Sequence, residues 1–403
     1  MGRPEIRFKG YTDEWEQRKL GDIASSFEYG LNAAAKEYDG ENKYIRITDI
    51  DDNTHKFLTD NLTSPDIDLT GADNYKLTEG DILFARTGAS VGKTYIYRNS
   101  DGLVYYAGFL IRARIKEEYD AEFVFQNTLT DRYNKYIAVT SQRSGQPGVN
   151  AQEYAEFEIN VPKKEEQTKI GTYFRNIDHL ITLHQRKCDE VKSLKKYMLQ
   201  KMFPQNEQKV PEIRFKGFTE AWEQRKLGEL YQRNTERNEN LIGYDKTISV
   251  ATMSYKDDGN GASESSLSTY KVIRVGDIAF EGHTNKQFRF GRFVVNDIGT
   301  GIMSPRFSTL RPLNEMPVNF WKQYIHSESV MRRILVNSTK AGTMMNELVI
   351  PEFLNQTIMV PSENEQAVIG QYFTNIDHLI TLHQQKCEEL KKIKKFMLQK
   401  MFV

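Results

Sequence analysis

Two stretches of the chain combine basic and aromatic side chains, a composition suited to binding the phosphates and bases of a nucleic acid. Residues 86–114 hold five Lys or Arg against one acidic residue, and residues 271–311 hold seven against three, so each stretch carries a net charge of +4. Arg and Lys contact phosphates, Arg also bonds guanine bidentately, and Asn or Gln suits adenine. On charge alone, an ordinary mixed surface explains either stretch equally well.

Ten side chains in and near these stretches have the chemistry for such contacts. A base-reading Arg replaced by Ala should lose about 1–3 kcal/mol and relax one target position, whereas a phosphate-contacting Lys should weaken all sequences alike. The candidates are Arg86, Lys93, Arg112, Arg143 and Gln146 in the first half, and Lys286, Arg289, Arg292, Arg306 and Lys340 in the second.

Residues 88–94, Gly-Ala-Ser-Val-Gly-Lys-Thr, look like a phosphate-binding loop, but they place three residues between the glycines where that loop needs four. The next three residues, Tyr95-Ile96-Tyr97, alternate like a strand where a helix should begin. A nucleotide site is therefore rejected. A glycine-rich turn beside basic residues could still let the backbone approach a DNA phosphate.

Motifs of catalysis are missing from the sequence. There is no Asn-Pro-Pro-Tyr or Asp-Pro-Pro-Tyr of amino-methyltransferases, no Gly-x-Gly-x-x-Gly, no Gly-x-Ser-x-Gly, and no Glu-x-Lys near the Pro-Asp at 65–66. His184 with Cys188, and His383 with Cys387, could hold zinc if two helices crossed there, but a mildly polar layer between helices is favoured. We expect no catalytic residue, metal or cofactor in this chain.

The whole chain gives no charge-based indication of a partner, because 55 Lys and Arg balance 55 Asp and Glu over 403 residues. Two cysteines fit a reducing compartment. Residues 1–20 lack the apolar core of a signal peptide, position 6 is Ile where myristoylation needs Ser or Thr, and no stretch is apolar enough to span a membrane. These features predict a cytoplasmic protein without a membrane partner.

The elements that must position the candidate side chains are duplicated. Four segments occur twice, at 4–10 and 211–217, 15–21 and 222–228, 176–185 and 375–384, and 198–203 and 397–402. The sequences between these matched ends differ. The pattern predicts one repeated scaffold that carries two different recognition surfaces.

The last two repeats lie in lysine-rich stretches that are typical of long helices, Glu165–Phe203 and Ser362–Phe402. At 1.5 Å per residue each helix would span roughly 58 Å, with Gly171 and Gly370 as weak points where it could bend. A helix of this length cannot bury itself against one small globule. Pairing of the two copies is therefore favoured over packing of each helix on its own domain.

One face of each long stretch is apolar at seven-residue spacing. Two copies in one chain can pack about a pseudo-two-fold axis, which makes them antiparallel. The expected core of the pair is Ile177, Leu180, His184, Val191, Leu194, Met198, Ile376, Leu379, His383, Leu390, Ile393 and Met397. A second apolar face is expected outside this core, formed by Leu183, Leu199, Leu382 and Leu398. An exposed apolar face of this kind predicts a binding partner.

Each divergent region has the runs of β-branched and aromatic residues that indicate strands. Strands are expected at 43–50, 80–86, 94–98, 103–115, 246–253, 276–280 and 288–296, and short helices at 121–137 and 317–336. The shared Gly-Asp-Ile-x-Phe at 80–84 and 276–280 indicates one fold in both regions. The predicted architecture is α+β: two similar globules, each followed by a long helix, with the helices paired as an antiparallel coiled coil. Its domains are 1–163, 164–203, a linker at 204–210, 211–361 and 362–403.

Over its whole length the chain resembles the specificity subunit of Type I restriction-modification systems. The segment Gly-Asp-Ile-Leu-Phe-Ala-Arg-Thr-Gly-Ala-Ser-Val-Gly at 80–92 looks like that family's target-recognition-domain signature. So do the Glu-Gln pairs at 166–167 and 365–366 and the repeated Trp-Glu-Gln-Arg-Lys-Leu-Gly. From residue 276 the signature becomes Gly-Asp-Ile-Ala-Phe-Glu-Gly-His-Thr, as expected if the two domains read different bases.

The resemblance implies a non-catalytic subunit of a phage-defence system. Each globule would read one half of a split, asymmetric target in double-stranded DNA, while the helices set the spacing and dock two methyltransferase subunits. Those subunits would carry S-adenosylmethionine, and restriction subunits using ATP and magnesium would join for cleavage. The missing methyltransferase motif speaks against a fused restriction-methylation enzyme. A stand-alone, two-headed DNA-binding or scaffold protein remains the alternative, and an adjoining methyltransferase gene would argue against it.

Overall fold

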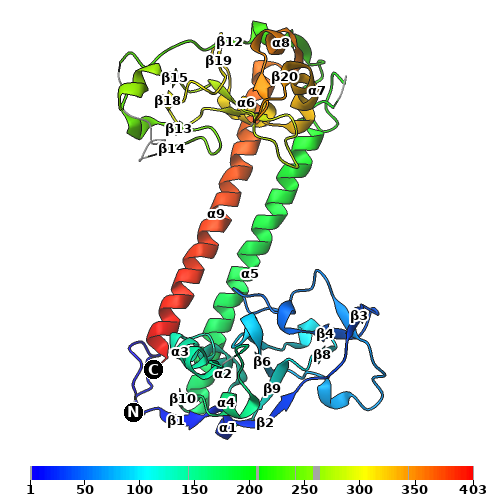
Figure 1. The fold of residues 1–403 in the computed structure, drawn as a ribbon, viewed down its shortest axis with the longest axis vertical. Coiled ribbons are helices and arrows are strands. Elements are labelled where there is room, and N and C mark those ends of the chain that lie inside the picture. Colours follow the sequence, from blue (N-terminus) through cyan, green and yellow to red (C-terminus); the bar gives the residue numbers. More distant parts are fainter. Residues whose placement is uncertain are drawn as a thin grey trace. The chain divides into compact units, whose positions relative to one another are not determined.

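The computed structural model describes residues 2–143, 145–205, 208–240, 242–256, 264–343 and 345–402. They form two compact units, Met1–His184 with Gln385–Val403, and Gln185–Gln384. Each unit holds one globule, the first half of the long helix that follows it, and the last half of the other long helix (Figure 1). The fold is mixed helix and strand with a repeated domain, as the sequence predicts.

Both globules are built on a four-stranded antiparallel sheet of the same topology. The first has the order β2 (Ala24–Tyr29), β9 (Leu110–Ile115), β6 (Ile82–Ala85), β7 (Thr94–Ile96). The second has the order β12 (Tyr231–Arg233), β19 (Thr309–Pro312), β16 (Ile278–Glu281), β17 (Arg292–Val295). The Gly-Asp-Ile-x-Phe repeat thus leads into the same inner strand, β6 or β16, in both globules.

Two-stranded pairs complete each globule. The repeated Glu-Gln-Arg-Lys forms β1 and β11, and each pairs antiparallel with the strand that precedes a long helix. These pairs are β1 (Glu16–Lys19) with β10 (Glu158–Val161) and β11 (Glu223–Lys226) with β22 (Thr357–Val360). The others are β3 (Ala35–Glu37) with β5 (Thr63–Pro65), β4 (Lys43–Ile45) with β8 (Val104–Tyr106), β13 (Ile248–Ser249) with β14 (Ser254–Tyr255), β15 (Lys271–Ile273) with β18 (Gly301–Met303), and β20 (Thr339–Lys340) with β21 (Glu347–Leu348).

Each short helix expected from the sequence is in fact two. Residues 121–137 contain α2 (Ala121–Asn127) and the start of α3 (Asp131–Thr140), and residues 317–336 contain α6 (Val318–Tyr324) and most of α7 (Glu328–Ser338). The break before α3 occurs at Thr130, whose hydroxyl caps the new helix by accepting from the Tyr133 amide at 3.3 Å. The remaining short helices are α1 (Leu20–Ile23), α4 (Ala151–Ala155) and α8 (Ile350–Asn355).

The long helices α5 (Lys164–Lys201) and α9 (Glu363–Met401) run unbroken through Gly171 and Gly370. A Cβ at Gly171 would lie 2.5 Å from Asp120 Oδ1, and one at Gly370 would lie 2.8 Å from the Phe320 nitrogen. The glycines therefore allow close packing of α2 and α6 against the long helices. They do not interrupt either helix.

Antiparallel packing of α5 on α9 is defined inside each unit by one ion pair. Lys394 Nζ lies 2.8 Å from Asp178 in the first unit, and Lys195 Nζ lies 2.7 Å from Asp377 in the second. Both residues of one pair differ from their counterparts in the other by 199 positions, so the same contact occurs once in each unit. Among the described residues, no helix combines the length and hydrophobicity of a membrane span.

The seam uses a different second row of residues from the one expected. Cys188 and Met202 are each 1% exposed, and they lie in the row that starts four residues after Ile177. The row that starts three residues after Ile177, and its equivalent in α9, was predicted to be core but is exposed. The exposed fractions are 40% for Leu180, 46% for Leu194, 43% for Leu379 and 37% for Ile393. The prediction was wrong because it ranked the two rows by hydrophobicity, which favours the row with Leu over the row with Cys and Lys. In the structure Lys195 and Lys394 lie in the seam because each pairs with an aspartate of the other helix.

The other expected core residues lie at or beside the seam. Ile177, Ile376 and Leu390 are 6%, 5% and 7% exposed. The others are partly buried, namely His184, Val191, Met198, His383 and Met397. Of the leucines expected on a second apolar face, Leu382 is 49% exposed. Leu199 and Leu398 instead pack against the cores of the two globules.

Each globule is fastened to both long helices by duplicated contacts. The repeated Pro-Glu-Ile-Arg-Phe-Lys-Gly supplies Arg7 and Arg214, which bind Glu166 and Glu365 through two bonds of 2.7 Å each. Both glutamates are 1% exposed. The other helix ends in an aromatic anchor: Phe402 contacts Phe123 and Phe174, and Phe203 contacts Tyr324 and Phe373. The repeated sequences therefore form the joints between globule and helix.

Candidate nucleic-acid interface

In the first globule, the loop after β6 is joined to the segment between α3 and α4. The Val149 amide donates to the Arg86 carbonyl at 2.9 Å, and the Gly88 amide donates to the Pro147 carbonyl at 3.0 Å. Gly88 has φ +70°, and a Cβ there would lie 2.9 Å from Gln146 Nε2. Three of the five candidates of this half, Arg86, Arg143 and Gln146, are brought together on this two-loop edge.

Arg86 is held by aromatic rings. Its guanidinium carbon lies 5.0 Å from the centre of the Tyr29 ring and 5.9 Å from that of Phe109. Tyr29 ends β2 and is 43% exposed, and Phe109 precedes β9 and is 56% exposed. Its main chain is fixed as well, because the Arg86 amide donates to the Phe109 carbonyl at 3.0 Å. Such stacking stabilises a guanidinium while leaving its N–H edges accessible.

The remaining first-half candidates are engaged in other contacts. Arg143 is exposed, donates to the Thr140 carbonyl at 2.8 Å and pairs with Glu153. Lys93 bonds the Ile50 carbonyl at 2.9 Å and pairs with Asp52, which turns it away from the two-loop edge.

Arg112 is a structural residue. It is 2% exposed, pairs with Glu28 across β9 and β2, and donates to the Asn74 carbonyl at 2.7 Å. Its guanidinium therefore has no surface to offer a ligand. The sequence singled it out because a strand arginine that points inward and one that points outward have the same flanking pattern.

The second globule has a related edge with different chemistry. The Asn346 amide donates to the Gly282 carbonyl at 2.9 Å, and Asn346 Nδ2 donates to the Arg289 carbonyl at 3.4 Å. Lys286 and Arg289 are exposed on this loop. The side chain of Asn285 accepts from the amides of residues 287 and 288, which shapes the turn that carries Lys286.

Lys340, Arg292 and Arg306 lie on other elements. Lys340 is exposed on β20, which pairs with β21 beside the same edge. Arg292, on β17, pairs with Glu281 and donates to the Ala251 carbonyl at 2.9 Å. Arg306 is exposed on the turn between β18 and β19, with its guanidinium carbon 4.9 Å from the Phe307 ring centre.

The aspartate of the Gly-Asp-Ile signature stabilises the sheet beneath the edge. Asp81 is 1% exposed, accepts from the Thr78 amide and hydroxyl, and binds Arg114 of β9 through two bonds. Asp277 is 2% exposed and binds Arg311 of β19 in the same way. The signature is thus explained by a buried carboxylate that closes a turn and ties two strands together.

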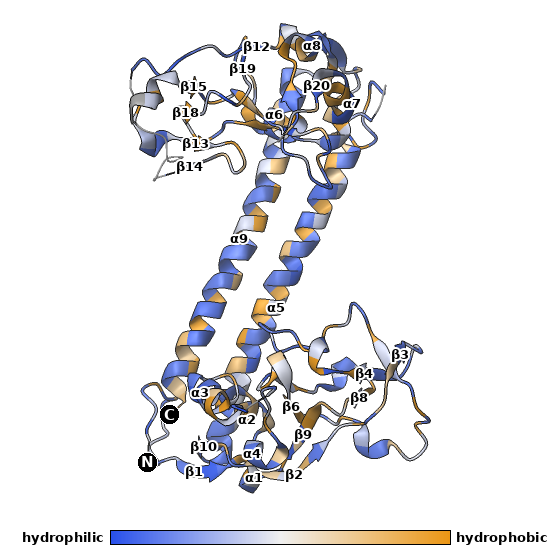
Figure 2. Ribbon diagram, viewed as in Figure 1, coloured by the Kyte–Doolittle hydropathy of each residue, from blue (hydrophilic) through white to orange (hydrophobic). Residues whose placement is uncertain are grey.

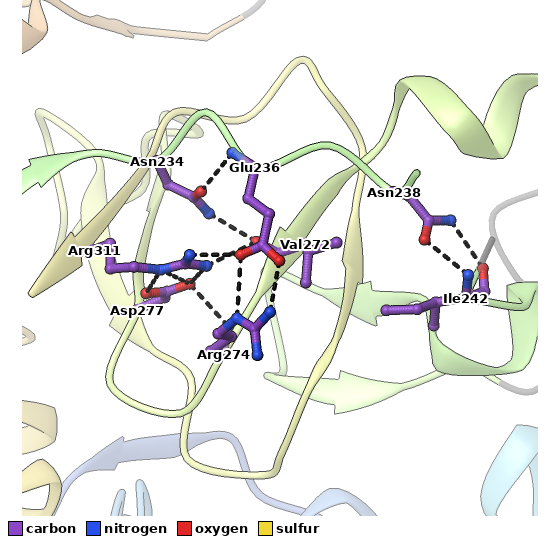
Figure 3. Close-up of polar contacts among 8 residues, drawn as sticks. All are labelled: Asn234, Glu236, Asn238, Ile242, Val272, Arg274, Asp277 and Arg311. Atoms are coloured by element: carbon purple, nitrogen blue, oxygen red, sulfur yellow. Dashed lines mark hydrogen bonds and ion pairs between the residues drawn. The ribbon is translucent and has the colours of Figure 1, made fainter. Parts of the chain in front are cut away.

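In the second globule this network is larger (Figure 3). Glu236 binds both Arg274 and Arg311. Its hydrogen bonds, with that from Arg274 the strongest influence and those from Arg311 next, hold the pKa of the Glu236 carboxyl at about 2. Asn234, which bonds the Val272 carbonyl at 2.8 Å, fixes the neighbouring strand end.

Among the described residues there is no cluster of three or more His, Cys, Asp and Glu side chains suited to a metal ion. The sulfur of Cys188 approaches the Ile380 carbonyl at 4.0 Å, and that of Cys387 approaches the Ile181 carbonyl at 3.6 Å. Both cysteines are buried in the helix pair.

Sequence reasoning missed the role of Tyr29 in this interface. Its partner Arg86 directly follows a different strand, and the two meet because β2 and β6 flank β9 in the sheet. No local pattern in the sequence could have indicated this contact. Exposed Phe109 was noticed as part of an aromatic patch, but its position beside Arg86 follows from the pairing of β6 with β9.

Comparison with known proteins identifies the class. The family described as Type I restriction modification DNA specificity domain matches residues 12–193 and again residues 219–392. The chain therefore belongs to that family and contains its domain twice. It is a DNA target-recognition subunit of a type I restriction-modification system, and such subunits are not themselves catalytic.

Individual relatives agree with this assignment. The MjaVIII specificity subunit of a type I restriction enzyme from Methanocaldococcus jannaschii is 22% identical over 407 residues, covering 95% of this chain and 91% of the relative. In fold, the S subunit of the M. genitalium type I system matches with a TM-score of 0.63 at 12% identity, covering 99% of both chains. A structure described for complex assembly and conformational transition of the type I system matches with a TM-score of 0.52 at 16% identity, covering 97% and 98%.

Proposed function

We propose that the two globules read the two halves of a bipartite, asymmetric DNA target. The observation that carries this proposal is the contrast between identical joints and different edges. Beside the same sheet lie Arg86, Arg143 and Gln146 in one globule and Lys286, Arg289 and Lys340 in the other, on loops and on β20. Two readers with different side chains on one scaffold are suited to two different half-sites.

The contact set follows from exposure and, for the partly buried Arg86, from its position over the Tyr29 and Phe109 rings at the two-loop edge. Arg86, Arg143, Gln146, Lys286, Arg289, Arg306 and Lys340 are the side chains we assign to DNA. Lys93 and Arg292 would have to leave an ion pair first, and buried Arg112 is assigned to the sheet.

A domain exchange tests the two-reader proposal. Residues 22–160 would be replaced with the same region of a homologue, and the methylated motif of the host would be read by single-molecule sequencing. One half of the motif should change while the other half and the gap stay the same. Changes in both halves would overturn the proposal.

We further propose that the paired helices dock two methyltransferase subunits. Large apolar side chains stay exposed on the long helices in both units: Leu180, Ile393 and Phe396 in the first, and their counterparts Leu379, Leu194 and Tyr197, with Leu382, in the second. Apolar residues recur along both helices in Figure 2. Exposed apolar side chains in this number are typical of a binding surface. Two equivalent groups suit two copies of one partner.

On this proposal S-adenosylmethionine belongs to the methyltransferase partner, and ATP and magnesium belong to restriction subunits. Replacing Ile393 and Phe396 with Ser should abolish co-purification of one methyltransferase copy. Because the equivalent residues in the second unit are untouched, the second copy should remain. Full two-copy binding by this variant, or a chain that binds target DNA specifically and tightly with no methyltransferase, would favour the stand-alone reading instead.

The helices are proposed to set the spacing between the half-sites. Inserting one heptad after Gln185 and another after Gln384 keeps the seam in phase, because seven residues repeat its pattern. It lengthens both helices by roughly 10.5 Å, which corresponds to about three base pairs at 3.4 Å each. The gap in the methylated motif should grow by about three and the bases should stay the same. An unchanged gap in a fully active variant would exclude the helices as the ruler.

A further inference from the structure

The arginines of the two candidate surfaces differ in what holds them. Arg112, Arg143 and Arg292 pair with carboxylates, although Arg112 and Arg292 also lie over aromatic rings. In the described part of the chain Arg86 and Arg306 pair with no carboxylate, and each lies over an aromatic ring instead. Both therefore keep their N–H donors available while the side chain is held in place.

This difference decides which arginines are prepared to read a base. An ion-paired arginine must break its bond to a carboxylate before it can bind DNA, and part of the binding free energy is lost in doing so. An arginine stacked on a ring loses little, because stacking uses the face of the guanidinium and base recognition uses its edge. Ordering of the side chain before binding also reduces the entropic cost.

The two arginines lie beyond the same end of equivalent strand pairs, Arg86 directly after β6 and Arg306 in the turn before β19. In the first globule, Ile82 pairs with Ala113; Arg86 comes four residues after Ile82, and Phe109 comes four residues before Ala113. In the second globule, Ile278 pairs with Leu310, so the position equivalent to Arg86 is Gly282 and the position equivalent to Phe109 is Arg306. In the first globule the arginine thus follows the inner strand, whereas in the second it precedes the strand that pairs with the inner one.

Close packing explains why the second globule cannot carry its arginine where the first one does. A Cβ at Gly282 would lie 1.9 Å from the Asn346 carbonyl oxygen. No side chain fits at that position unless the 345–348 segment moves. In the first globule the Val149 amide bonds the Arg86 carbonyl in the equivalent way, but Arg86 carries a side chain, which lies over the Tyr29 and Phe109 rings.

We propose that Arg86 and Arg306 are the specificity-determining arginines, and that each reads one guanine in the major groove of its own half-site. This inference rests on the proposed two-reader function. The O6 and N7 acceptors of guanine match the two parallel donors of a guanidinium edge. Because the arginines adjoin opposite strands of the pair, the guanine occupies a different place relative to the sheet in each half-site.

Substitution at each arginine tests the proposal in the complete complex with its methyltransferase. Arg86→Ala should lower the preference for guanine at one position of the first half-site by about 5- to 150-fold and leave the second half-site unchanged. Arg306→Ala should do the same in the second half-site only. Arg86→Lys keeps the charge without the two-pronged edge, so it should lose the base preference but keep the salt dependence of binding.

Matched variants separate base reading from phosphate contact and from simple damage to the fold. Arg143→Ala and Lys286→Ala should weaken binding to all sequences alike and reduce the salt slope by about one. Tyr29→Phe keeps the ring and should keep the guanine preference, whereas Tyr29→Leu removes it and should relax that same position. Thermal unfolding of each variant shows whether the chain has stayed folded.

The outcomes distinguish failure of this inference from failure of the proposed function. A wild-type complex whose motif is not bipartite overturns the proposed function. A bipartite wild-type motif that keeps every base requirement in Arg86→Ala and Arg306→Ala, with only the salt slope reduced, overturns the inference alone and makes both arginines phosphate contacts. Loss of base preference in both half-sites from one substitution would also overturn it.

Discussion

The joints between globule and helix are nearly identical in the two halves, whereas the edges proposed to read DNA are not. Arg7 with Glu166 and Arg214 with Glu365 have the same geometry and the same burial. By contrast, the loop after the inner strand begins with Arg86 in the first half and with Gly282 in the second, where a Cβ would lie 1.9 Å from the Asn346 carbonyl oxygen. Duplication has kept the contacts that orient a globule and has left its reading edge free to change.

The largest effect is expected from removal of either joint arginine, which tests whether the two joints contribute equally to stability. Arg7→Ala and Arg214→Ala each leave a glutamate buried without a partner, which costs about 3–5 kcal/mol. We expect equal losses in the free energy of unfolding of the two units, measured by urea titration of the whole chain. Arg18→Ala and Arg225→Ala, at equivalent exposed positions of the other repeat, serve as controls and should cost about 1 kcal/mol or less. Unequal losses from the joint variants would show that the joints differ in energy despite their common geometry.

Gly171 and Gly370 provide a second test of how similar the globule–helix contacts are in the two halves. Ala at either site would gain about 1 kcal/mol of helix propensity in isolation. Crowding should reverse that gain, by about 1–3 kcal/mol, because the new methyl group meets α2 or α6. Gly370→Ala should be the more damaging of the two, since it meets the main chain at Phe320, while Gly171→Ala first meets the Asp120 side chain. Ser193→Ala, at an exposed helix position, is the control; a stabilised Gly370→Ala would refute the packing argument.

The Glu236 network should make the two globules respond differently to acid. Because the pKa of the folded-state carboxyl is lowered to about 2, its contribution is present above the ordinary glutamate pKa and is lost as pH falls from about 5 towards 2. Glu236→Gln should remove about 1–2 kcal/mol at pH 7 and flatten the acid limb of the stability curve for the second unit. The measurement is urea unfolding at several pH values with a probe in each unit. An acid limb that keeps its slope in the variant would contradict this assignment.

The smallest effect is expected in the helix seam. Lys195→Met and Lys394→Met replace half-exposed ion pairs with apolar side chains of similar length, so the change in stability should stay within about 1 kcal/mol for either one. The two values should agree, because the same contact occurs once in each unit. A large loss from one variant alone would show that the pair holds the helix register in that unit.

Much of this architecture could be predicted from the sequence because repeated segments mark the scaffold directly. The long helices follow from their lysine-rich amphipathic pattern, and the common sheet follows from Gly-Asp-Ile-x-Phe. The choice between Leu180 and Ile181 as seam residues could not be made, because rows three and four residues after Ile177 are both compatible with one apolar face. Only the partner helix, through Asp377 and Asp178, selects the row that contains the lysines.

The recognition edge was predictable in composition and not in geometry. Arg86, Arg143 and Gln146 were candidates because of their chemistry, and contacts between distant segments bring them together. Burial of Arg112 depends on Glu28 across the sheet, and the aromatic hold on Arg86 depends on the strand order. Such facts arise from tertiary pairing, which no local pattern encodes.

The main-chain bond between Ile6 and Lys400 has a consequence for the order of the two halves. It is matched by the bond between Ile213 and Lys201, where the chain passes from one helix into the next globule. The first residues of each globule are therefore positioned by the C-terminal end of the other half's long helix. This contact forms both where the helix continues into the globule and where it does not. A circularly permuted chain, opened at 204–210 and closed by a copy of that linker between the present ends, should regain the same contacts. The order in which a gene encodes the two readers is then open to exchange during evolution.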